Sequence, residues 1–198
     1  LDQIRVALER HAPNEIEPVG RRQAGVAMLL REREGRPQVL FIERAERRGD
    51  PWSGHMAFPG GRIERRDPHI RGAAERETRE EVGVSLDDAE LLGRLDDMQG
   101  HRASGHPNLV ISAFVYHVPD PPELTLNHEV REAFWFGLGD LRDPGRHVDF
   151  PLRSIRGMRF PGILVGEPDR HVVWGLTYRF LQHFFDVVGL PLPRKEAG

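Results

Sequence analysis

The sequence contains no cysteine among its 198 residues. Disulfide frameworks, thiolate metal sites and cysteine nucleophiles are therefore excluded. No apolar run approaches the roughly 18 residues that a membrane-spanning helix needs. The opening segment LDQIRVALERHAP also lacks the apolar core of a secretory signal. We expect a cytoplasmic protein that does not enter a membrane.

Charge of one sign is not concentrated anywhere in the chain. The 31 acidic and 28 basic residues give a net charge of −3. Because no long basic block is present, nucleic acid is not expected as a partner. The length and the hydrophobic content of 38% suffice for one sizeable core. We expect a single domain over residues 1–198. Whether two copies of the chain form a homodimer is left open.

Apolar runs alternate with polar, Gly- and Pro-containing segments in an order typical of a mixed, layered α/β domain. Residues 1–20 are predicted to form a short helix and a linker, and residues 174–189 a helix that covers the sheet. The segment from about Ile70 to Val82 is predicted as a further helix, capped by Gly83. Strands are predicted near residues 23–31, 38–43, 89–95, 109–117, 132–136 and 158–165, the first two joined as a hairpin.

Three glutamates on the predicted helix over 70–82 carry the strongest chemical signal. Glu77, Glu80 and Glu81 are spaced i, i+3 and i+4, so their carboxylates share one helix face. Clustered negative charges repel one another unless cations compensate them, and several oxygen ligands suit Mg²⁺ or Mn²⁺. A solvated acidic face with ion pairs to Arg76 and Arg79 is the competing interpretation.

A double glycine before this helix favours the metal interpretation. Gly60 and Gly61 allow positive φ angles and a close approach of the backbone to a ligand or an ion. The loop that follows them is expected to bring Asp67 towards the helix. A glycine turn beside an acidic helix face therefore predicts a site for a metal and an anionic substrate.

Together these residues resemble the box of the Nudix hydrolases, G-x5-E-x7-R-E-U-x-E-E-x-G-U, in which U is a bulky apolar residue. The match runs from Gly61 to Val84. Asp67 stands in place of the first Glu, eight residues rather than seven precede Arg76, and Thr78 fills an apolar position. The resemblance implies an α/β/α sandwich with a mixed sheet and metal-dependent hydrolysis of a diphosphate linkage.

The chain resembles the coenzyme A diphosphatase subgroup more specifically. That subgroup shares the Asp and the longer spacing, and upstream it shows L-L-T-x2-R-x3-R-x3-G-x3-F-P-G-G. Arg44, Arg48, Gly54 and Phe58 fall into this pattern. Two extra residues separate Arg48 from Gly54, and Ile42 stands where Thr is expected.

The resemblance assigns roles to the box residues. It implies that Glu77, Glu80 and Glu81 hold Mg²⁺ or Mn²⁺, with the Gly60 carbonyl as a further ligand. One of the glutamates is a candidate for accepting a proton from the attacking water. Arg76 would pair with a glutamate and orient it.

Members of the family often use another carboxylate from outside the box. Glu129 precedes the strand predicted near residues 132–136, in the corresponding part of the chain. Glu132 is a competing candidate. For Glu129, the alternative role is a strand-edge charge that limits aggregation.

The substrate is expected to contact Gly61 and three arginines near the glycine turn, namely Arg44, Arg48 and Arg62. Guanidinium groups bind phosphates through forked, charge-assisted hydrogen bonds. For each arginine alone, a solvated surface position is the alternative. His101 and His106 lie in the connection DMQGHRASGHPN, interpreted as a lid or a long turn without a convincing third ligand for a metal.

We therefore expect an enzyme that acts on a small nucleotide-type substrate. The leading interpretation is cleavage of coenzyme A or acyl-coenzyme A to 4′-phosphopantetheine, or its acyl form, and adenosine 3′,5′-bisphosphate. A diphosphatase for ADP-ribose or NADH is the enzymatic alternative. A Nudix-fold nucleotide sensor without turnover is a third, although it would not need the full set of acidic residues.

Overall fold

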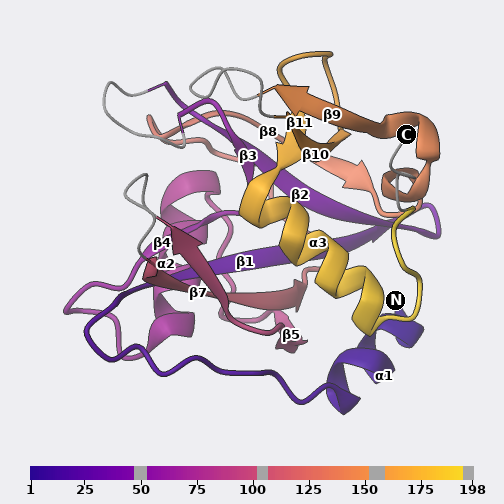
Figure 1. Ribbon diagram of the computed structural model, residues 1–198. Coiled ribbons are helices and arrows are strands. Elements are labelled where there is room, and N and C mark those ends of the chain that lie inside the picture. Colours follow the sequence, from indigo (N-terminus) through magenta and orange to yellow (C-terminus); the bar gives the residue numbers. More distant parts are fainter. Residues whose placement is uncertain (47–52, 102–106, 152–158, 194–198) are drawn as a thin grey trace.

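The computed structural model describes residues 1–46, 53–101, 107–151 and 159–193 (Figure 1). Two long antiparallel strands lie at the centre of the main sheet, β1 (Arg22–Arg33) and β2 (Arg36–Arg44). They turn at Glu34 and Gly35, which both have positive φ. The predicted hairpin is confirmed, and each strand is a few residues longer than expected.

The main sheet is mixed. Strand β1 pairs in parallel with β7 (Pro107–His117), whereas the other pairings are antiparallel among the described residues. The five remaining strands of this sheet are β3 (Met56–Ala57), β4 (Gly60–Arg62), β5 (Glu90–Arg94), β6 (Met98–His101) and β8 (Val130–Gly137). Strand β8 pairs with β2 along most of its length, and β4 pairs with β1 at the glycine turn.

Helices cover both faces of this sheet, and β1 shows the alternation that divides them. Met28 and Leu30 belong to the core cluster that includes α3 (Gly175–Val187). Ala27 and Leu29 belong to the cluster that includes α2 (Ile70–Val82). Successive strand residues point to opposite faces, so the sheet is buried on both sides. Figure 1 shows α3 across the front of the sheet and α2 behind it.

A smaller sheet precedes α3 in the sequence. It consists of β9 (His147–Pro151), β10 (Arg159–Leu164) and β11 (Val172–Trp174), all antiparallel. Two short 3₁₀ helices, Asp140–Arg142 and Pro144–Arg146, connect β8 to β9. The N-terminal helix α1 (Asp2–Arg10) packs against β5 and contributes Ile4 and Leu8 to the core on the α3 side.

The ends of α2 follow directly from local sequence. The His69 side chain accepts a hydrogen bond from the Gly72 amide at the N-terminus, and Gly83 ends the helix with φ 76°. Thr78 occupies an apolar position of the box with its buried hydroxyl satisfied, because the hydroxyl donates to the Ala74 carbonyl at 2.7 Å. The predicted bounds of this helix are confirmed.

Several short strands were not predicted. Strands β3, β4, β9 and β11 span two to five residues each, too few for a clear alternating pattern. The connection interpreted as a lid or a turn begins instead as strand β6, which ends at His101, and His106 lies outside the described residues. Among the described helices, none is long and apolar enough to span a membrane.

Candidate active site

The acidic face of α2 lies against the glycine turn, as Glu81 shows most clearly. Its side chain is 1% exposed, and its Oε2 accepts a 2.9 Å hydrogen bond from the Gly60 amide. Burial raises the pKa of Glu81 to about 8, and the negative charges of Glu77 and Glu129 act in the same direction. The Gly60 amide and the Arg44 guanidinium oppose this rise.

Gly60 requires glycine, and Gly61 leaves room for the Glu77 carboxylate. Gly60 has φ 153°, and a Cβ there would lie 2.6 Å from the Cα of Val26 on β1. A Cβ on Gly61 would lie 2.5 Å from the carboxylate carbon of Glu77. Gly61 therefore lets the backbone lie close to the Glu77 carboxylate, and the predicted approach to a ligand or an ion stays a prediction.

The Glu77 carboxylate on α2 is close enough to Glu129 for the charge of Glu129 to raise its pKa. Burial raises the pKa of Glu77, Arg76 lowers it, and the charges of Glu80 and Glu129 raise it further. Glu129 directly precedes β8, where its carbonyl accepts from the Ala45 amide and its own amide donates to the Asn127 side chain, both at 2.8 Å. Residues 52 positions apart in the sequence thus contribute carboxylates to one cluster.

Arg76 holds the acidic face together. Its guanidinium is 8% exposed and donates to both oxygens of Asp67, at 2.9 and 3.1 Å. It also contacts Glu77 at 2.9 Å and Glu80 at 3.1 Å, and it donates to the Arg62 carbonyl at 3.1 Å. These hydrogen bonds hold the pKa of Asp67 below its ordinary value. The Asp that departs from the box is therefore the forked partner of Arg76.

Glu80 differs from its two neighbours in exposure. Its side chain is 40% exposed, and it accepts from Arg66 at 3.0 Å as well as from Arg76. Two arginines therefore compensate its charge. Glu81 is the buried member of the acidic face, Glu77 is partly buried, and Glu80 lies at its rim.

The predicted substrate-binding arginines occupy different positions. The Nη1 of Arg44, at the end of β2, lies 3.8 Å from Glu81 Oε1. The Arg62 side chain is exposed on β4, while its carbonyl supports Arg76. Arg48 lies outside the described residues. Arg44 is therefore the predicted arginine that the structure brings to the acidic cluster.

Glu132, the competitor of Glu129, lies in a separate ion-pair group that sequence reasoning missed. Arg170 donates to Glu43 and to Glu132, both at 2.6 Å, and the His171 Nε2 lies 3.4 Å from Glu132. Glu43 is 1% exposed within the apolar run of β2. This buried polar residue is the sequence signal that could have indicated the group.

The chemistry of the buried cluster fits a hard divalent cation. Its carboxylates come from Glu77, Glu81 and Glu129, with Glu80 at the rim, and all the donor atoms are oxygens. Like charges that raise one another's pKa are stabilised when a cation joins them. These oxygen ligands favour Mg²⁺-like over zinc-like coordination. The neighbouring His128, whose Nε2 lies 3.9 Å from Glu129 Oε1, is a highly exposed side chain.

The two helix layers, the mixed sheet and the acidic helix beside a glycine turn together define a Nudix-type α/β/α fold. A family model described as the NUDIX domain matches residues 21–155. The chain therefore belongs to the Nudix family. The predicted fold class and the predicted hydrolase class are both confirmed. Members of this family generally use divalent metal ions.

Two sequence relatives illustrate the match. An uncharacterized protein of Schizosaccharomyces pombe is 39% identical over 127 residues, which are 62% of this chain and 39% of that protein. An uncharacterized Nudix hydrolase NudL of Citrobacter koseri is 27% identical over 177 residues, 88% of this chain and 86% of the relative. This chain thus spans less than half of the fission yeast protein and most of the bacterial one.

Two solved structures show the same fold. A MutT/nudix family protein from Enterococcus faecalis has a TM-score of 0.56 at 20% identity, covering 91% of this chain and 66% of that one. The Ap4A hydrolase of C. elegans has a TM-score of 0.50 at 21% identity, covering 60% of this chain and 82% of that one. At these identities the likeness concerns the fold.

Proposed function

We propose that this protein hydrolyses the diphosphate linkage of coenzyme A or acyl-coenzyme A with the help of Mg²⁺ or Mn²⁺. The observation that carries the proposal is the acidic cluster of buried Glu81 with the partly exposed Glu77 and Glu129, which lies against the glycine turn. Glu77, Glu80 and Glu81 would hold the metal, with the Gly60 carbonyl beside them. Bound there, the cation would neutralise phosphate charge and lower the pKa of a water.

The surrounding residues orient the glutamates and take no part in covalent chemistry. Arg76 fixes Glu77 through a 2.9 Å contact, and Asp67 in turn fixes Arg76 with two hydrogen bonds. The Gly60 amide fixes Glu81. Glu129 comes from a different element and its side chain is 33% exposed, so it is suited to accept the proton of the attacking water at the rim.

Arg44 is suited to the scissile diphosphate. Its guanidinium lies 3.8 Å from the buried Glu81 carboxylate, so a phosphate bound at the acidic cluster would be within its reach. An arginine in this place would act on any diphosphate substrate. Selection of the 3′-phosphate of coenzyme A would then depend on another basic group, for which Arg48 is the candidate.

An aromatic group beside Arg44 supports a nucleotide-type substrate. Trp174 contacts His55 at a ring distance of 4.6 Å, and Phe150 and Phe160 each at 5.6 Å. The His55 carbonyl accepts from the Arg44 amide at 3.1 Å, which places this half-buried group next to the candidate site. Such rings can stack on an adenine, so Trp174→Ala should raise KM roughly tenfold.

Support for coenzyme A over other diphosphates comes from the sequence pattern. Asp67, the eight-residue spacing to Arg76 and the partial pattern through Arg44, Gly54 and Phe58 resemble the coenzyme A diphosphatases. Phe58 is buried and stacked on Phe41 at 5.6 Å, so its part is to anchor the turn.

Product analysis by mass spectrometry with three compounds in parallel tests the substrate. Coenzyme A, 3′-dephospho-coenzyme A and ADP-ribose share an adenosine diphosphate but differ in the 3′-phosphate and the second arm. We expect coenzyme A to have the highest kcat/KM. The dephospho form should be roughly tenfold to 100-fold poorer, the value of one charge-assisted contact.

Two variants distinguish the roles of Arg44 and Arg48 in the same assay. Arg48→Ala should narrow the gap between the two coenzyme A forms, whereas Arg44→Ala should lower kcat/KM for all three compounds alike. If ADP-ribose is cleaved best, yielding AMP and ribose 5-phosphate, the coenzyme A assignment is wrong while the metal-dependent chemistry stands.

A further inference from the structure

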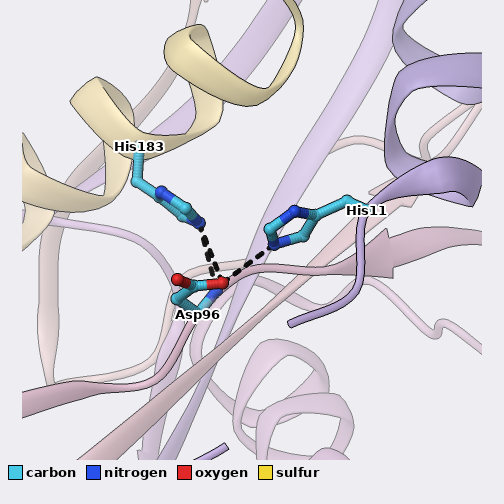
Figure 2. Close-up of side chains that lie close together, drawn as sticks. All are labelled: His11, Asp96 and His183. Atoms are coloured by element: carbon cyan, nitrogen blue, oxygen red, sulfur yellow. Dashed lines mark hydrogen bonds and ion pairs between the residues drawn. The ribbon is translucent and has the colours of Figure 1, made fainter. Parts of the chain in front are cut away.

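A second group of metal-ligand side chains lies on the α3 side of the molecule (Figure 2). It consists of His11, which follows α1, Asp96 between β5 and β6, and His183 on α3. The three residues come from segments about 85 positions apart, and their ligand atoms lie within 4.8 Å of one another. This side of the sheet is opposite the one covered by α2, which bears the acidic cluster.

The distances between these ligand atoms are close to those of a tetrahedral metal site. Asp96 Oδ1 lies 2.9 Å from His11 Nε2 and 3.3 Å from His183 Nε2. Tetrahedral zinc with bonds of about 2.0–2.2 Å separates its ligand atoms by about 3.3–3.6 Å. His183 already has this spacing, and His11 needs to withdraw by a few tenths of an ångström. Side-chain exposures of 16 to 25% leave access for a water as fourth ligand.

One hydrogen bond in the group leaves the Nε2 of His183 unprotonated. The Asp96 amide donates to His183 Nε2 at 3.2 Å, so this nitrogen carries a lone pair. The same nitrogen lies 3.3 Å from Asp96 Oδ1, so a metal ion bound there would replace the amide as the partner of its lone pair. The negative charge of Asp96 favours a cation beside it. The geometry therefore indicates a place for a positive charge.

Asn14 orients the carboxylate from behind. Its backbone amide donates to Asp96 Oδ1 at 3.1 Å, and its side-chain amide donates to Oδ2 at 3.0 Å. Residues that hydrogen-bond to a metal ligand in this way fix its direction and strengthen metal binding. The segment between α1 and β1, expected to be a plain linker, is thus held against the turn between β5 and β6.

The other histidine and carboxylate group in the described chain lacks these properties. In the group of Glu43, Glu132 and His171, the Arg170 guanidinium already bonds both carboxylates at 2.6 Å. The His171 Nδ1 accepts from the Glu167 amide at 3.0 Å, so a neutral ring carries its proton on Nε2, towards the carboxylates. Because Arg170 already compensates the negative charge of both carboxylates, no metal site is inferred there.

We propose that His11, Asp96 and His183 bind a divalent transition-metal ion of the zinc type, separate from the catalytic cluster. Imidazole ligands suit Zn²⁺ and its neighbours, whereas the all-oxygen cluster on α2 suits Mg²⁺. The ion would join the N-terminal segment, the β5–β6 turn and α3. Zn²⁺ binding at this group stabilises the fold without taking part in hydrolysis.

Titration of the metal-stripped full chain with Zn²⁺ in excess Mg²⁺ tests this site, because Mg²⁺ occupies the oxygen cluster. We expect one Zn²⁺ per chain and a rise in Tm upon binding. Co²⁺ in the same experiment should give the strong visible absorption of tetrahedral coordination. Mg²⁺-dependent hydrolysis should be unchanged by occupancy of this site.

Four variants locate the bound ion. His11→Gln and His183→Gln keep an amide for hydrogen bonding but remove the ring ligand, so Zn²⁺ affinity should fall by more than about 100-fold, and Asn14→Ala should weaken it about 10- to 100-fold. The matched control is His117→Gln, since His117 faces Glu90 at 3.4 Å with similar exposure but lies outside the group. The Zn²⁺ affinity of His117→Gln should match that of the wild type.

Two results would overturn the proposal. The first is Zn²⁺ affinity in His11→Gln and His183→Gln equal to that of the wild type. The second is a wild type that does not bind Zn²⁺ tightly, together with a lower Tm of these variants. The three residues would then stabilise the fold through their hydrogen bonds alone. Neither result bears on hydrolysis at the acidic cluster, so the two proposals fail independently.

Discussion

The Gly60 amide donates a 2.9 Å hydrogen bond to the carboxylate of Glu81, a side chain that is only 1% exposed. One backbone donor and the Arg44 guanidinium at 3.8 Å do not offset the burial of this group, and its pKa rises to about 8. A carboxylate kept under such conditions destabilises the metal-free protein. Function, rather than stability, explains its position.

Glu81→Gln therefore separates stability from activity. The amide has the same size and no charge, so the metal-free protein should become more stable by about 1–3 kcal/mol. Hydrolysis should fall on the order of 100- to 1,000-fold, because a metal-binding charge is lost. Thermal unfolding in chelator and kcat measure the two effects. A wild-type rate in this variant would show that Glu81 does not hold a metal ion needed for hydrolysis.

Asp67→Asn tests whether Asp67 holds the Arg76 guanidinium in place. The Asp67 side chain is 4% exposed and holds Arg76 by two hydrogen bonds, so the substitution leaves a buried guanidinium partly unpaired. We expect a loss of about 2–3 kcal/mol in urea unfolding, and reduced kcat through displacement of Glu77.

Glu64→Gln is the matched control for Asp67→Asn. Glu64 pairs with Arg66 at 2.9 Å in the same loop, but both side chains are more than half exposed. Its substitution should change stability by less than about 0.5 kcal/mol. Equal losses in the two variants would contradict a special role for the Asp67 and Arg76 pair.

Glu129 and Glu132 lie three residues apart, and the sequence left open which of them is the additional carboxylate outside the box. Variants of the two residues can be compared directly. Glu129→Gln should lower kcat about 100-fold or more, with little change in KM, if Glu129 accepts the proton of the attacking water. Glu132→Gln should leave kcat within about twofold, because Glu132 pairs with Arg170 and His171 away from the cluster. The reverse order of effects would assign the role to Glu132.

The contact between α1 and β5 gives a pH-dependent prediction. Arg5 donates to both oxygens of Glu90, at 2.7 and 2.9 Å, and this lowers the pKa of Glu90 to about 2. A lowered carboxyl pKa stabilises the fold above its ordinary value of 4.5, and this contribution is lost as the pH falls towards 2. Glu90→Gln should lower Tm by about 1–4 °C at pH 6, a modest effect for an exposed pair.

The same comparison at low pH checks the cause. The difference in Tm between the wild type and Glu90→Gln should shrink steadily below pH 4.5. A difference that stays constant down to pH 2.5 would show that the substitution acts through packing instead of charge.

The helix α2 and its glycine turn were predictable because their signals are local. Glu77, Glu80 and Glu81 fall on one face by helical spacing alone, and Gly83 marks the end of the helix. Gly61 was also expected to allow a close approach, although its partner, Glu77, is apparent only in the structure.

The remaining contacts join residues that no local pattern relates. Arg170 reaches Glu43 across 127 positions, and His183 reaches Asp96 across 87. Each of these residues has an ordinary surface interpretation when it is read alone. Only the pairing of strands and the packing of α3 on the sheet bring them together, so a single sequence could not predict either group.

The most direct test of metal-dependent hydrolysis uses coenzyme A and metal-stripped protein, with products identified by mass spectrometry before and after addition of Mg²⁺. We predict no turnover without metal and, with Mg²⁺ in the millimolar range, stoichiometric 4′-phosphopantetheine and adenosine 3′,5′-bisphosphate from the wild type. Glu81→Gln should remain nearly inactive under both conditions. Full hydrolysis after exhaustive chelation, or equal rates for the wild type and Glu81→Gln, would contradict a metal-dependent reaction at the acidic cluster.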